Sequence, residues 1–100
     1  MTAQLMVFAT PHEGMDEEYN RWYTDVHIPE MLTIPGVVSC ERHRLVRGGP
    51  DEARYLSVFV LDGEPSAVLA ELGARAADGR MTVSAAADSA RTRLTVWHSV

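Results

Sequence analysis

The segment spanning residues 19–45 constrains the fold most, because it predicts a helix, a break and a strand in direct succession. Apolar side chains recur there at three- and four-residue steps, the spacing that places them on one helix face. Those side chains are Tyr19, Trp22, Tyr23 and Val26. Asp16 is the expected N-cap, since its carboxylate can accept a hydrogen bond from a free backbone N–H group. The predicted helix must bury its apolar face against another layer.

A proline is expected to interrupt this helix. Pro29 lacks a backbone N–H group and disfavours the helical conformation at Ile28, so the regular helix should end or kink just after His27. His27 would then lie at a helix C-terminus, where the helix dipole favours the imidazolium form. Residues 35–36, a Pro-Gly pair, predict a turn before the next strand.

The rest of the chain alternates apolar and polar residues in short segments. Strands are predicted at residues 4–10, 37–47, 54–61 and 91–98, and a second helix from Glu64 to a stop at Asp78 and Gly79. Residues 81–90 are expected to form an irregular connection with room for a short helical turn. The order βαββαβ predicts an α+β, ferredoxin-like fold, a four-stranded antiparallel sheet with two helices on one face, in a single domain spanning residues 1–100. The strand at 37–47 carries charge on both faces, so part of it should meet solvent or pair its charges across a dimer interface.

The composition excludes several classes of protein. A formal net charge of −5 disfavours non-specific nucleic-acid binding, which needs clustered basic residues. Cys40 is the single cysteine, so no internal disulfide is expected, and no Cys or His spacing resembles a zinc site. The N-terminus shows no leader pattern and no apolar run is long enough to span a membrane, so we expect no membrane association and a cytoplasmic location.

A motif in the constraining segment is similar to that of a known family. The matching residues are Trp22, Tyr23, His27 and Pro29, then Ile34, Pro35, Gly36 and Val37, then Arg42 and Arg44. Together they resemble the EthD-like branch of the dimeric α/β-barrel superfamily. The resemblance implies a homodimer in which two sheets pack face to face and cover the faces that the helices leave open. The superfamily includes polyketide cyclases, lactone isomerases, cofactor-independent oxygenases and haem enzymes, so it does not choose the reaction.

Candidate catalytic residues follow from the pocket expected between the helices and the sheet. His27 is the leading candidate, because an imidazole can move protons near neutral pH. A structural role for His27 at the helix end stays open. His98 shares a strand face with Leu94 and Val96, where it would either pair with His27 or be exposed near the C-terminus. Tyr23 would either donate a hydrogen bond to a substrate carbonyl or pack with its hydroxyl at the rim.

Candidate substrate-binding residues are Phe8, Trp22, Arg42, His43 and Tyr55. Each has a structural alternative: Trp22 as core, Arg42 as a solvated or ion-paired strand residue, and Tyr55 as a packing residue. No metal or cofactor is expected, since no nucleophile elbow, phosphate loop or metal motif is present. We therefore expect a cofactor-independent cyclase, isomerase or lyase that uses His-assisted proton transfer. The resemblance implies a small hydrophobic substrate, polyketide-like, aromatic or lactone. A cofactor-free monooxygenase and a non-catalytic dimeric binding or accessory protein are the alternatives.

Overall fold

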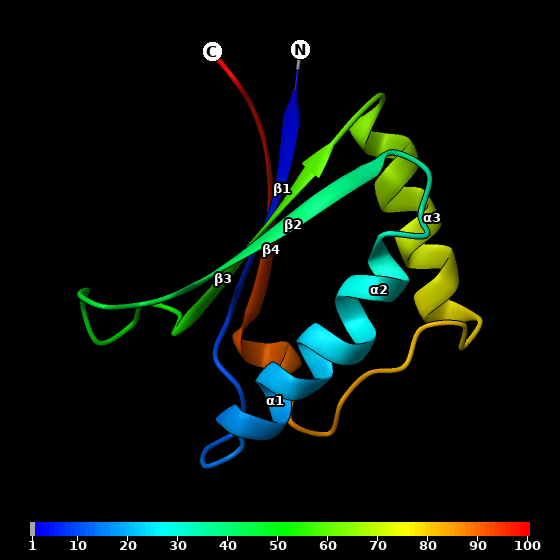
Figure 1. Ribbon diagram of the computed structural model, residues 1–100. Helices are drawn as coiled ribbons and strands as arrows, with labels where there is room; N and C mark the ends of the chain where they lie inside the picture. Colours follow the sequence, from blue (N-terminus) through cyan, green and yellow to red (C-terminus); the bar gives the residue numbers. More distant parts are fainter. Residues whose placement is uncertain (1) are drawn as a thin grey trace.

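A four-stranded antiparallel sheet with helices on one face forms the protein (Figure 1). The computed structural model describes residues 2–100. The strands are β1 (Ala3–Ala9), β2 (Val37–Arg44), β3 (Tyr55–Leu61) and β4 (Thr92–His98), and they lie in the order β2-β3-β1-β4. The helical elements are α1 (Asp16–Trp22), η1 (Tyr23–His27), α2 (Ile28–Met31), α3 (Pro65–Ala77) and η2 (Ser89–Arg91). The predicted ferredoxin-like plan is confirmed.

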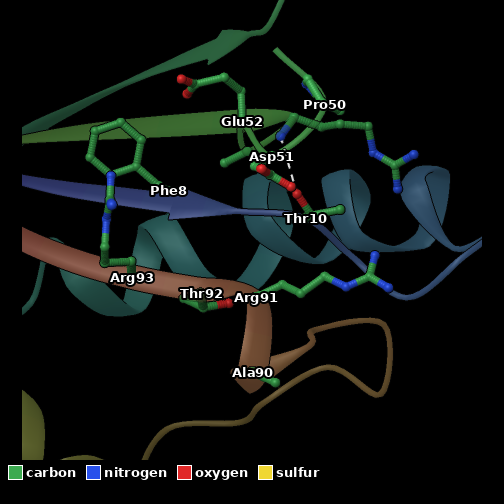
Figure 2. Close-up of a pocket in the computed structure, with 11 residues that line it drawn as sticks. Phe8, Thr10, Pro50, Asp51, Glu52, Ala90, Arg91, Thr92 and Arg93 are labelled. Carbon is green, nitrogen blue, oxygen red and sulfur yellow. Dashed lines mark hydrogen bonds between the residues drawn. The ribbon is translucent and has the colours of Figure 1, made fainter. Parts of the chain in front are cut away.

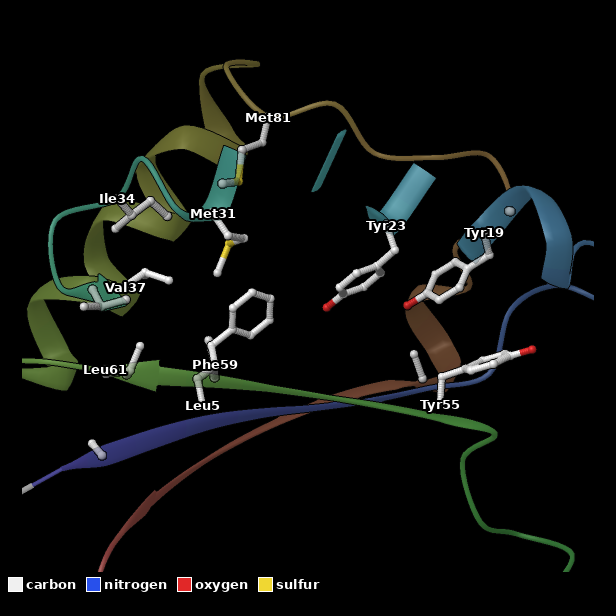
Figure 3. Packing of buried hydrophobic residues seen from close by; sticks show 14 residues of the cluster. Leu5, Tyr19, Tyr23, Met31, Ile34, Val37, Tyr55, Phe59, Leu61 and Met81 are labelled. Carbon is white, nitrogen blue, oxygen red and sulfur yellow. The ribbon is translucent and has the colours of Figure 1, made fainter. Parts of the chain in front are cut away.

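Strand alternation builds the core between the sheet and the helices. On β1 and β3 the residues that face the helices are buried, and Leu5 and Phe59 have no exposed surface. Tyr23 and Met31 reach down from the helical segment onto these strands (Figure 3). Burying side chains of this size stabilises the folded state by about 1.5–3 kcal/mol each. This layer therefore holds the helical segment, and the residues it carries, against the centre of the sheet.

The helix does not stop at His27, as the sequence led us to expect. The chain stays helical from Asp16 to Met31, with a π-helical turn, η1, in the middle. The N–H group of Ile28 donates to the carbonyl of Tyr23, five residues back, and Ile28 itself has helical angles (φ −60°, ψ −48°). This wider turn accommodates the ring of Pro29 and its missing N–H group. A π-helical bulge thus replaces the expected helix end.

Two smaller predictions also change. Met15, not Asp16, is the N-cap of α1, and the carboxylate of Asp16 accepts hydrogen bonds from Tyr55 Oη (2.8 Å) and Arg54 Nη2 (3.1 Å) instead. Strand β2 ends at Arg44, because the Gly- and Pro-containing loop at 45–54 leads the chain away from the sheet. The 81–90 connection is irregular, as expected, and its last residues enter the single helical turn η2.

Gly36 makes the tight turn into β2. Its φ of +95° suits glycine, and an added Cβ would lie 2.9 Å from both the Asp62 carbonyl oxygen and Val68 Cγ2. The turn brings α2 and β2 against the start of α3. No helix among residues 2–100 is both long and apolar enough to cross a membrane.

Candidate functional site

A cavity of about 360 Å³ lies between the helical segment, the sheet and the connection that follows α3. Its volume is in the range of small-molecule sites. The lining residues come from every layer: Leu5, Val7, Tyr19, Trp22, Tyr23, His27, Met31, Phe59, Leu72, Val83, Ala87, Ser89, Thr92 and Leu94. No Asp, Glu, Lys or Arg is among these described residues, so the cavity is apolar and aromatic with very few polar groups.

His27 is the titratable imidazole in the wall of this cavity. Its ring stacks on Trp22 with centroids 4.7 Å apart and meets the rings of Tyr23 (4.8 Å) and Phe59 (6.4 Å) edge-on. In a regular α-helix residues five apart lie ~140° apart around the axis, so the π-helical turn is what aligns Trp22 with His27. Both predicted aromatic site residues of this segment, Trp22 and Tyr23, thus pack directly on the histidine.

The surroundings of His27 keep it neutral. Burial lowers the pKa of His27 to about 4, and the nearby positive charge of Arg42 acts in the same direction. Its Nδ1 atom is buried and has no hydrogen-bond partner within residues 2–100. The expectation of a helix-end imidazolium is therefore wrong, because the helix continues and the ring lies inside the protein. A neutral imidazole at pH 7 can accept a proton.

Tyr23 supplies a hydroxyl group without a partner. Burial raises the pKa of Tyr23 far above its usual value, so the group stays protonated. Its hydroxyl makes no hydrogen bond of standard geometry within the described residues, although the Ser57 side chain is close enough to lower its pKa slightly, and the group points toward Phe59 (Figure 3). A buried hydroxyl of this kind is free to donate a hydrogen bond to a ligand oxygen.

Arg42 lies behind this wall and outside the cavity lining. Its guanidinium carbon is 4.1 Å from the ring centroid of Tyr23. Its Nε donates to Ser57 Oγ (3.3 Å) and its Nη1 donates to Asn20 Oδ1 (2.8 Å). The pairing register of β2 and β3 is the signal that could have found this position, because it places Arg42 opposite Ser57 on the helix-facing side of the sheet. The sequence predicted a substrate-binding residue or, as the alternative, a solvated or ion-paired one, because it does not show that the tyrosines cover this strand.

Other predicted site residues lie elsewhere. Tyr55 is buried beside Tyr19, with ring centroids 6.1 Å apart, and its hydroxyl is bonded to Asp16. His98 is exposed at the end of β4, opposite Ala3, and does not line the cavity. His43 is on the open face of the sheet, and its Nε2 lies 2.9 Å from Glu41 Oε1.

Phe8 lines a second hollow, on the open side of the sheet (Figure 2). This hollow measures about 860 Å³ and is bordered by three arginines, of which Arg54 pairs with Asp16 and Arg91 with Asp88. The third, Arg93, lies over the Phe8 ring at 4.8 Å. Among residues 2–100, no histidine and no unpartnered buried group lines this hollow, so the cavity beside His27 is the candidate site. Within residues 2–100 no cluster of three or more His, Cys, Asp or Glu side chains has the geometry to hold a metal ion.

Comparisons with known proteins agree on the fold. No protein-family model matches the sequence, and no curated protein matches it significantly. The heme-degrader MhuD from Mycobacterium tuberculosis, solved with two hemes in its active site, superposes with a TM-score of 0.72 at 19% identity, over 98% of this chain and 95% of MhuD. A candidate monooxygenase from Shewanella loihica PV-4 gives 0.69 at 15% identity, over 99% and 94% of the two chains.

An ethyl tert-butyl ether D (EthD) family protein from Bacillus halodurans C-125 gives a TM-score of 0.65 at 14% identity, over 100% of both chains. Identities this low establish the fold and leave the reaction open. The motif at Trp22, Tyr23 and His27 predicted a fold of this kind, and the chain has the ferredoxin-like fold of the EthD family protein and of these other solved proteins.

Proposed function

We propose that the protein is a cofactor-independent enzyme that moves a proton on a small hydrophobic molecule. The observation that carries the proposal is a neutral His27 in the wall of an apolar cavity that Tyr23 also lines, with the Tyr23 hydroxyl buried in the same wall. His27 accepts a proton from an acidic C–H or O–H group, and the electron pair stays on the substrate as an enolate or phenolate. Tyr23 donates a hydrogen bond to that oxygen. Return of the proton at another carbon completes an isomerisation. In a cyclisation the enolate carbon instead bonds to a carbonyl carbon of the same molecule, the π bond of that carbonyl breaks, and its oxygen takes the proton from His27.

The apolar cavity walls support this chemistry, because a bound ligand would leave little water around the reacting groups. The indole N–H of Trp22 donates to the carbonyl of Thr82 (3.1 Å), which ties the connection after α3 to the helical segment. Val83 and Ala87 from that connection complete the lining. A poorly hydrated cavity strengthens the hydrogen bond to a developing oxyanion and protects a reactive intermediate. Polyketide-like, aromatic and lactone compounds are the substrate classes that suit such walls.

Cofactor-free oxygenation is the second candidate, favoured by the structural similarity to a candidate monooxygenase. The same base would form the substrate carbanion, which then reduces molecular oxygen without a bound cofactor. Oxygen consumption separates the two reactions, because isomerisation and cyclisation consume none. A dimeric binding or accessory protein would show ligand binding without turnover of either kind.

A thermal-shift panel of hydroxylated aromatic, quinone and lactone compounds tests the site. A ligand at 100 times its Kd should stabilise the wild-type protein by about 2.7 kcal/mol. Leu94→Trp should abolish that shift, because Leu94 lines the cavity and is 46% exposed, so an indole there fills the mouth with little cost to the core.

Leu69→Trp is the matched control, since Leu69 is 37% exposed on α3 and does not line the cavity. Hits are then assayed for product and for oxygen uptake. Equal ligand shifts in both tryptophan variants would contradict the proposed site. A further experiment adds haem to the wild-type protein and to His27→Gln. A Soret band that forms in the wild type and is absent in His27→Gln would contradict a cofactor-free reaction.

We also propose that the open sheet face joins two copies of the chain. Its middle carries half-buried apolar side chains, among them Met6, Leu56 and Val58, and Trp97 is 54% exposed at its edge. An isologous pair of such faces would bury them. Val58→Arg should convert a dimer to a monomer in sedimentation velocity, and Ala70→Arg, exposed on α3, should not. A wild-type monomer at micromolar concentration would refute the dimer.

A further inference from the structure

Arg42 carries a partly buried positive charge without a carboxylate partner. Among residues 2–100 its guanidinium forms no ion pair, and its hydrogen bonds go to the neutral groups of Ser57 and Asn20. Its Nη2 atom is buried and has no hydrogen-bond partner in the part of the chain that the structure describes. Buried charges are normally paired, because removing an ion from water is costly. A guanidinium in this setting, beside a cavity, is able to interact with a negatively charged group.

The charge is directed toward the cavity wall. The guanidinium carbon lies 4.1 Å from the ring centroid of Tyr23 and 5.8 Å from that of Tyr19, and both tyrosines line the cavity. Tyr55 is the third ring around it, at 5.5 Å. The carboxylate beyond that ring, Asp16, is already paired with Arg54.

The titratable groups around Arg42 are held neutral. Burial raises the pKa of Tyr19 and Tyr23, and it raises the pKa of Cys40 to about 11. Burial lowers the pKa of His27 to about 4. Near pH 7 none of these four groups carries a negative charge that balances the guanidinium.

We propose that Arg42 is a positioning residue that supplies the counter-charge for an oxyanion in the cavity, acting through the ring of Tyr23. The inference rests on the proposed function and names its substrate class: phenols and enols, which can become anions, rather than neutral molecules of the same shape. A cation over the face of a phenol ring favours donation by its O–H group, and it stabilises an anion at the far end of that hydrogen bond.

The expected size of the effect follows from Coulomb's law. A unit charge roughly 6 Å from the anion, screened by an effective dielectric constant of about 40 because the guanidinium is only partly buried, shifts an ionisation equilibrium by about one pKa unit. The effect should act on ligands that ionise and should be small for ligands that cannot. That difference separates an electrostatic role from a purely structural one.

The test measures the ionisation of bound para-nitrophenol, whose phenolate is yellow and whose phenol form is colourless. All proteins carry His27→Gln, so that the imidazole cannot take the ligand's proton. Arg42→Gln should raise the pKa of the bound ligand by about one unit, because glutamine can keep hydrogen bonds to Ser57 and Asn20 but has no charge. It should weaken phenolate binding about tenfold and leave the affinity for para-nitroanisole, the neutral analogue, unchanged.

Arg42→Lys keeps the charge and should retain most of the wild-type shift. Arg44→Gln removes an exposed charge from the same strand and should change neither affinity nor ionisation. An unchanged pKa of the bound ligand in Arg42→Gln, with binding intact, overturns the role of Arg42 and leaves the cavity in place. If Arg42→Gln does not fold, Arg42→Lys gives the test. A rise of one unit in the pKa of the bound para-nitrophenol in Arg42→Lys would also overturn the role of Arg42. Failure of the wild-type cavity to bind either compound overturns both the inference and the proposed site.

Discussion

Replacing His27 with glutamine should lower kcat for the cavity's substrate by about 10²–10⁴-fold, the usual contribution of a positioned general base. Glutamine is close in size to histidine and can still pack against Trp22 and Phe59, but its amide cannot accept a proton. The cavity should keep its affinity for neutral ligands, so the loss should appear in kcat rather than KM. Turnover of a compound identified by thermal shift, measured at saturation, checks this result.

His43→Gln is the matched control for that loss. His43 is exposed on the open face of the sheet, away from the cavity, and its replacement should leave turnover unchanged. The wild-type rate should also stay level from pH 8 down to about pH 5 and fall toward pH 4, where burial sets the pKa of His27. Undiminished turnover in His27→Gln would contradict the general-base role and would leave His27 with only a structural role in the helix.

The fold could be read from the sequence because its signals are local and repeated. Alternation of apolar residues marks all four strands, and Pro65 with Gly79 bounds α3 closely. The effect of Pro29 on the helix could not be predicted in the same way. A proline predicts an interruption, and only packing decides between a helix end and a π-helical turn. Burial of Tyr23 and Met31 on the sheet favours continuing the helix here.

The candidate site could be predicted only in part, because its properties depend on what lies between the layers. Helical spacing indicated that Trp22, Tyr23 and His27 share a region, and all three line the cavity. Alternation alone could not show that Arg42 lies under a tyrosine layer, since a charged strand residue is solvated in most proteins. Exposure of His98 likewise depends on how far α3 and its connection extend over β4.

The second large effect that we expect, after the loss of kcat in His27→Gln, is on the pH dependence of stability. The free energy of unfolding of the wild-type protein should fall by about 3 kcal/mol, through His27 alone, as the pH drops from 6.5 to about 4. Folding lowers the pKa of His27 from 6.5 to about 4, so between these values the unfolded chain binds a proton that the folded chain does not. The contribution of neutral His27 to the free energy of unfolding is complete above pH 6.5, declines as the pH falls, and is lost below about pH 4. Urea unfolding followed at several pH values measures it.

Comparison with His27→Gln isolates this contribution, because carboxylates protonate over part of the same range in both proteins. The stability difference, wild type minus His27→Gln, should shrink by about 3 kcal/mol between pH 6.5 and 4, since glutamine does not titrate. A domain of this size has a total stability of roughly 5–15 kcal/mol, so the change is large enough to move the urea midpoint clearly. His43→Gln should follow the wild-type curve. Parallel pH curves for wild type and His27→Gln would show that His27 is solvated, and an imidazole in contact with water could not be the neutral base of a dry cavity.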